Sequence, residues 1–222
     1  MTGRVDGARR RAALVFRRTR SEVRARSGEV VHSLRRRRQP QDWTRTSPHR
    51  VLTVATEDVA LLTAHRLPED VRGRRIDGDW DVRAVDVDST RLAVALRRRF
   101  VDGRDWASCG LAEAGAEPEV PGLGDRYRTM GPAELARRMA VLDALHASLR
   151  EEGWRPHHEV GAPFVREMAV CLGRDGQLIR NRGGLHRLII ARMIGLDVIP
   201  VRLLAEHVAA PVRPLEVPPT GH

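Results

Sequence analysis

Residues 171–201 read CLGRDGQLIRNRGGLHRLIIARMIGLDVIPV and carry the clearest structural pattern in the chain. A short apolar run leads into an Asp-Gly turn, the chain returns as a second strand, and a helix follows a pair of glycines. A glycine then ends the helix, and a β-branched run predicts a last strand. In chain order, the expected elements are strand 167–172, turn 174–176, strand 177–180, helix 184–194 and strand 199–204.

The rest of the chain predicts fewer elements. Residues 50–55 alternate as a strand does. Asp88 or Ser89 is the expected N-cap of a helix that stops at Asp102-Gly103, and a second helix has Pro132 in its first turn and ends near residue 153. Residues 67–81 and 113–124 are expected as irregular segments. The predicted fold class is α+β, a small mixed sheet with packed helices.

The start of the helix at Gly183-Gly184 is a candidate anion site. First-turn N–H groups and the helix dipole favour negative charge there, and glycines let a ligand approach the backbone closely. Arg187 lies in the first turn and can contact a phosphate through two nitrogens, with His186 as a second donor. The alternative is structural: Arg187 pairs with a carboxylate such as Asp175, and His186 is a core histidine.

Three segments of this region, residues 170–178, 183–191 and 196–201, resemble the ParB/sulfiredoxin-like superfamily. There a strand pair leads to a Gly-x-x-Arg-type motif that opens a helix, and the final strand begins with Ile-Pro-Val. The resemblance implies a nucleotide site, for ATP or CTP with Mg²⁺. It assigns the phosphate contacts to Gly183, Gly184, His186 and Arg187.

Two departures from the superfamily narrow the function. Sulfiredoxin activity requires a cysteine where this chain has Leu185, so sulfinic acid repair is not expected. Partition proteins follow the arginine motif with a second phosphate motif and a helix-turn-helix domain, and only about twenty residues follow the last strand here. A sliding DNA clamp is therefore not expected.

An enzyme of this kind also needs a carboxylate to hold a metal or accept a proton. Asp79 and Asp81 flank Trp80 in a loop and are the candidates, with His186 assisting; a solvated acidic loop explains the aspartates equally well. The pair His157-His158 lacks a third ligand at a useful spacing, so no metal site is assigned to it.

Charge divides the chain into unequal parts. All 39 basic residues are arginine, which excludes mechanisms that need a P-loop, Schiff-base or kinase lysine. Residues 1–38 hold thirteen arginines and three acidic residues, whereas the remainder has 26 of each. The expected organisation is an arginine-rich extension and linker at 1–48, a ParB/sulfiredoxin-like domain at 49–207 and a disordered proline-rich tail at 208–222.

The sequence thus predicts a protein that binds a nucleotide or another phosphate-bearing ligand and that hydrolyses it or transfers a phosphoryl group if it is an enzyme. Two alternatives stay open: a nuclease-like or regulatory protein that binds nucleic acid through residues 1–38, and an adapter without a ligand. No apolar run is long enough for a membrane span, and a cytoplasmic location is expected. Cys109 and Cys171 are expected as buried free thiols.

Overall fold

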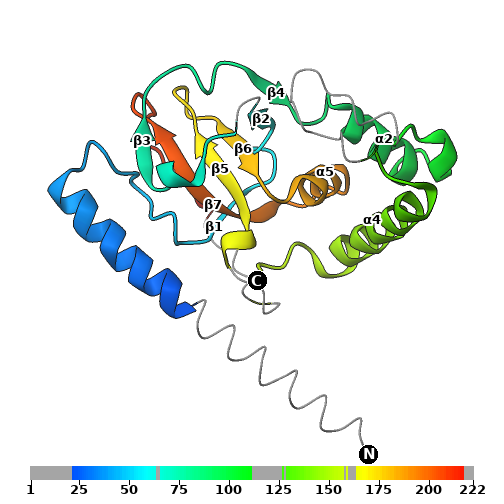
Figure 1. The fold of residues 1–222 in the computed structure, drawn as a ribbon, viewed down its shortest axis with the longest axis horizontal. Coiled ribbons are helices and arrows are strands. Elements are labelled where there is room, and N and C mark those ends of the chain that lie inside the picture. Colours follow the sequence, from blue (N-terminus) through cyan, green and yellow to red (C-terminus); the bar gives the residue numbers. More distant parts are fainter. Residues whose placement is uncertain are drawn as a thin grey trace, which may run out of the picture.

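The computed structural model describes residues 22–63, 66–111, 127, 129–157, 159 and 164–217. Within these residues the chain forms a mixed seven-stranded sheet and four helices. The helices span 22–38, Arg91–Phe100 (α2), Pro132–Glu152 (α4) and Leu185–Met193 (α5). Figure 1 shows α2, α4 and α5 grouped beside the sheet, with the helix over 22–38 at the far end of the molecule. This arrangement confirms the α+β fold class.

The sheet follows the order β1-β7-β5-β6-β2-β4, and β3 pairs with β7 beyond the end of β1. The strands β5 and β7 run parallel at its centre, and β5 and β6 form the predicted antiparallel hairpin. Their bounds are Leu52–Ala55 (β1), Leu61–Thr63 (β2), Arg74–Ile76 (β3), Ala84–Asp86 (β4), Met168–Leu172 (β5), Leu178–Arg182 (β6) and Val198–His207 (β7).

The central strands β5 and β7 are buried on both faces, as expected for strands that are covered on both sides. All five residues of β5 are buried. One face, with Val170 and Leu203, packs against α2, α4 and α5 in the main core, and the other, with Cys171 and Leu204, forms a smaller core with Trp80. Both cysteines are buried and free, as predicted.

The helices begin and end close to where the sequence places them. Thr90, rather than Asp88 or Ser89, caps α2: its hydroxyl accepts a hydrogen bond from the N–H of Ala93 at 3.1 Å. Gly103, two residues beyond the last turn, has φ +70°, and α4 starts at Pro132. The short strands β2, β3 and β4 were not predicted, because three residues are too few to show alternation. Residues 112–126, which contain the expected excursion, lie outside the described residues.

The segments 22–38 and 208–217, on either side of the predicted domain, both pack against that domain, although the sequence predicted an extension and a disordered tail. Residues 22–38 form one continuous helix, and Gly28 does not interrupt it: a side chain there would meet the ring of His49 at 2.6 Å, so glycine permits this close approach. Residues 208–217 were predicted as disordered but pack on the body. The N–H of Val217 donates to the carbonyl of Thr53 at 3.0 Å, and Arg213 donates to the carbonyl of Gly176 at 3.0 Å.

Candidate anion-binding site

The start of α5 lies against the beginning of β5. Gly183 and Gly184 both have positive φ, +71° and +62°, which glycine adopts without strain. A β-carbon on Gly184 would approach the side chain of Met168 to 3.0 Å, so both conformation and space require glycine there. No side chain of the described residues caps the helix, and Gly183 is exposed. The positive end of the α5 dipole therefore points toward an accessible surface.

Arg187 is half-buried in the first turn of α5 and has no carboxylate partner among the described residues. Its guanidinium lies 5.8 Å from the ring centroid of Trp154, and its Nη1 is 3.1 Å from Nε2 of His157. Burial and the charge of Arg187 lower the pKa of His157 to about 4, so the imidazole is neutral and accepts from the guanidinium. Asp175, the suggested carboxylate partner, is exposed in the β5–β6 turn at the opposite end of β5.

His186 is part of a polar cluster that joins α5 to α4. Its Nε2 hydrogen-bonds the hydroxyl of Tyr127, and its Nδ1 lies 3.1 Å from Nη2 of Arg138. His186 is half-buried and so is not an enclosed core histidine. Through its contact with His186, Arg138 adds a further guanidinium next to the first turn of α5. Gly183, Gly184, His186 and Arg187 thus share the start of α5, where Tyr127 and Arg138 hold His186, and Trp154 and His157 hold Arg187.

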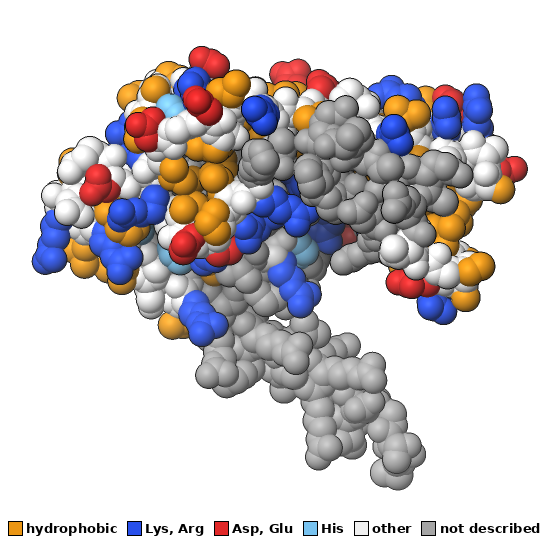
Figure 2. Space-filling view, turned by 45° about the horizontal axis from the view of Figure 1, so that its top comes forward, with side chains coloured by type: hydrophobic (Ala, Val, Ile, Leu, Met, Phe, Trp, Pro, Cys, Tyr) orange, Lys and Arg blue, Asp and Glu red, His pale blue; other side chains and the backbone are white. Residues whose placement is uncertain are grey.

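Arg180, on β6, was missed by the sequence analysis. Its side chain is buried, and Nε donates to the carbonyl of Gly183 at 2.9 Å, while no described acidic residue pairs with it. Burial, and then the charge of Arg66, lower its pKa to about 9. Figure 2 shows basic side chains gathered with histidine in the middle of one face, next to residues that are not described.

Strand alternation puts Arg180 on the same side of the sheet as Leu178, which faces the helices, and a bulge in the β5–β6 hairpin then turns Arg182 to the other side. Val170 pairs with Arg180, whereas Ala169 pairs with Arg182, so Asn181 is an extra residue in β6. Val170 belongs to the core under the helices and Ala169 to the core on the other face. Arg182 accordingly contacts Glu69 on the far face of the sheet, at 3.2 Å. Arg180 lies on the helix side, next to the start of α5. Such a bulge redirects side chains without changing the strand order.

Glu167 is a buried carboxylate that reaches this region. It is 1% exposed; Oε1 accepts from the backbone N–H of His157, and Oε2 has no described hydrogen-bond partner. Its backbone carbonyl lies 3.6 Å from the position of a β-carbon on Gly183. Burial raises the pKa of Glu167 to about 7, although the His157 N–H and the charge of Arg187 oppose the rise. Near neutral pH this carboxyl group therefore exchanges a proton.

The structure does not bring Asp79 and Asp81 to this site. Both pair with Arg174, each through a 2.8 Å contact to Nη2, and Asp81 also accepts from the N–H of Arg174 at 2.7 Å. Burial alone would raise the pKa of Asp81, but the contacts with Arg174 lower it. Arg174 follows β5, whereas Gly183 lies beside its first residue, so about 13 Å of strand separates them. These aspartates hold the β5–β6 turn against the loop that carries them.

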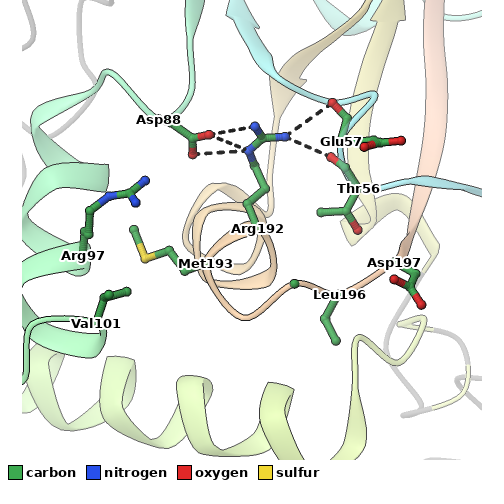
Figure 3. A pocket seen from close by; sticks show the side chains of 10 residues that line it. Thr56, Glu57, Asp88, Arg97, Val101, Arg192, Met193, Leu196 and Asp197 are labelled. Atoms are coloured by element: carbon green, nitrogen blue, oxygen red, sulfur yellow. Dashed lines mark hydrogen bonds and ion pairs between the residues drawn. The ribbon is translucent and has the colours of Figure 1, made fainter.

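A cavity of about 560 Å³ lies at the other end of α5. Figure 3 shows Arg192 between Asp88 and the chain after β1. Arg192 contacts Asp88 at 2.7 Å and donates to the carbonyls of Thr56 and Glu57 at 3.2 and 3.4 Å. Asp88 neutralises the charge of Arg192, whereas Arg180 and Arg187 have no carboxylate partner among the described residues. The contacts of Arg192 tie α5 to the chain after β1 and to the start of α2.

Two further features bear on the predictions. The described residues contain no group of three metal-ligating side chains, and His158 lies outside them. No helix in the described part of the chain combines the length and the apolar character needed to cross a membrane.

No family model, curated protein or solved structure matches the chain.

Proposed function

We propose that the protein binds a nucleotide, or another ligand with a phosphate group, at the start of α5. The observation that carries the proposal is the buried guanidinium of Arg180, which has no acidic partner among the described residues and lies next to the carbonyl of Gly183. A buried cation without a counter-ion costs several kcal/mol, so folded proteins rarely keep one without use. A bound anion would supply the missing negative charge.

The surrounding groups fit a phosphate in particular. Arg187 can offer two nitrogens to two phosphate oxygens, while Trp154 and His157 hold its guanidinium in place. The backbone at Gly183 and Gly184 provides N–H groups at the positive end of the helix. His186 and Arg138 lie on the α4 side and can contact a second phosphate of the same ligand. The combination suits a di- or triphosphate better than a carboxylate.

The resemblance to the ParB/sulfiredoxin-like superfamily supports the same proposal and favours ATP or CTP with Mg²⁺. A catalytic form of the proposal, hydrolysis or phosphoryl transfer, needs a carboxylate near the phosphates. Because Arg174 holds Asp79 and Asp81 at the far end of β5, Glu167 takes that place in the proposal, as a proton acceptor when it is ionised. Binding does not depend on this catalytic step.

The test is ligand-induced thermal stabilisation of the full chain with ATP, CTP, GTP, UTP and pyrophosphate, each with and without Mg²⁺. A ligand at a hundred times its Kd should stabilise the fold by about 2.7 kcal/mol. Arg187→Ala should abolish that gain. Arg97→Ala is the matched control, because it removes an exposed arginine from α2 and should leave the gain unchanged.

A second variant, Arg180→Met, separates binding from a structural role. Methionine keeps much of the volume and removes the buried charge, so the ligand-free variant should melt at or above the temperature of the wild type while losing the ligand response. If Arg180→Met lowers the melting temperature but keeps the response, the arginine is structural and the site is misassigned. A flat response of the wild type to every ligand would favour the adapter alternative.

A further inference from the structure

We propose that the outward face of the helix over 22–38 binds an anionic lipid surface, with the helix lying parallel to the headgroup plane. This face carries an apolar stripe of Val23, Val30 and Leu34, whose side chains are 58%, 60% and 53% exposed. At 3.6 residues per turn the three project within about 40° of one another. Large apolar side chains aligned on one exposed face indicate an interaction surface.

The contacts of the helix with the body fix which face is free. His32 is buried, and its Nε2 hydrogen-bonds the hydroxyl of Thr44 at 3.0 Å. The same ring packs edge-on against Trp43, with 5.9 Å between centroids, and Gly28 lies against His49. His32 projects about 180° from Val23 around the helix axis. The apolar stripe therefore points away from the protein.

Arginines border the stripe on both sides. By helical geometry, Arg26 and Arg37 lie along one edge, and Arg24 and Arg38 along the other. All four are exposed, and residues 22–38 hold six arginines against two glutamates. An apolar face between basic edges is typical of helices that lie in a membrane interface, where the apolar side chains enter the acyl boundary and the basic ones contact phosphates. Basic residues near an anionic surface add to the attraction, and the attraction weakens as the salt concentration rises.

A groove runs along the flank of the helix that carries Arg37, between the stripe and the buried side. It has a volume of about 550 Å³ and lies between the helix and the segment 40–50. Arg36, Arg37, Arg45 and Arg50 line it, and Glu29 is the acidic residue among its lining residues. Arg37 belongs to both the groove and the edge of the stripe. Arg50 pairs with Glu216 at 2.6 Å and Arg45 lies 3.7 Å from Glu206, so Arg37 and the neighbouring Arg36 are the basic groups that this flank offers to phosphate headgroups.

Other occupants fit this face less well. Nucleic acid would contact the arginines but would leave the apolar stripe against phosphates and water. A second copy of the helix would bring two rows of arginines together with only Glu22 and Glu29 to offset them. Figure 2 shows basic and apolar side chains next to one another at the end of the molecule where this helix lies. An anionic lipid surface complements both kinds of side chain at once.

The test uses the full chain and two sets of vesicles, one of phosphatidylcholine alone and one with a third of phosphatidylglycerol, in sedimentation assays at 0.1 M salt. The wild type should sediment with the anionic vesicles only. The variant V23Q/V30Q/L34Q keeps every charge and should lose at least tenfold in its partition coefficient. The control V94Q/V141Q/V212Q removes three exposed valines elsewhere and should bind as the wild type does.

Circular dichroism and duplex DNA binding complete the experiment. Both triple variants should keep the helix content of the wild type, so that a loss of sedimentation reports on the stripe. Equal sedimentation of V23Q/V30Q/L34Q and wild type would overturn the proposal, because charge alone would then explain the binding. DNA binding without vesicle binding would also overturn it, in favour of a nucleic-acid surface.

Discussion

Replacing Glu167 by glutamine should stabilise the protein at neutral and alkaline pH and have little effect at or below pH 4.5. Glutamine keeps the acceptor that receives the N–H of His157, and its amide nitrogen takes the place of Oε2, which has no described partner. The substitution therefore removes one titrating group and leaves the packing nearly unchanged. The variant measures how much the buried carboxylate costs the folded state.

The magnitude follows from the pKa of Glu167, which burial raises from 4.5 to about 7. Below pH 4.5 both the folded and the unfolded states are protonated, so the carboxyl group has no effect on stability. Between pH 4.5 and 7 the unfolded state ionises first, and the wild type loses stability as the pH rises. At about 1.4 kcal/mol per pKa unit, the full loss above pH 7 is at most about 3.5 kcal/mol, of which about 3 kcal/mol falls between pH 4.5 and pH 8.5.

Urea unfolding of wild type and Glu167→Gln at pH 4.5 and pH 8.5 tests this reasoning. The difference in free energy of unfolding should grow by about 3 kcal/mol in favour of the variant between the two pH values. Titration of His157 lowers the stability of both proteins in acid and largely cancels in the difference. A difference that stays constant with pH, or that favours the wild type at pH 8.5, would refute a buried carboxylate with a raised pKa.

Three further substitutions test the framework around the site. Gly184→Ala should lower the free energy of unfolding by about 1–3 kcal/mol, because alanine is strained at φ +62° and crowds Met168 at 3.0 Å; an unchanged urea midpoint would contradict this. Asp81→Asn should reduce stability by weakening the pair with Arg174 and should leave the response to nucleotides intact, so a lost response would return the aspartate to the site. Leu188→Ala, in the main core, should cost about 2–5 kcal/mol in chemical denaturation, and a cost below 1 kcal/mol would mean that α5 is loosely packed.

The candidate site was predicted in part. Local sequence is enough to place Gly183, Gly184, His186 and Arg187 together, because all four belong to a single helix start. Arg180 was missed because an arginine in a strand of alternating side chains appears to be on the solvent side. One signal was present: Arg180 ends the predicted strand 177–180 and lies three residues before Gly183, at the predicted anion site.

The two aspartates that the sequence suggested for an enzyme lie away from the start of α5. Asp79 and Asp81 were chosen for their spacing in a loop, but spacing says nothing about which end of the sheet the loop reaches. The contacts with Arg174 place that loop at the β5–β6 turn, and Glu167, one residue before β5, is the carboxylate near α5. A pair of residues distant in sequence can be located only when the register of the strands between them is known.

The sequence by itself determined the hairpin at 168–182, the helix after Gly184, the last strand, α2 and α4, since turn residues, caps and apolar periodicity act over a few residues. Only the tertiary structure decided the order of the strands, the side of the sheet that Arg182 faces and the face of the helix over 22–38 that remains open. The strand order depends on long-range pairing, the side of Arg182 depends on the bulge, and the open helix face depends on the buried His32. Each of these joins residues that are far apart in the chain.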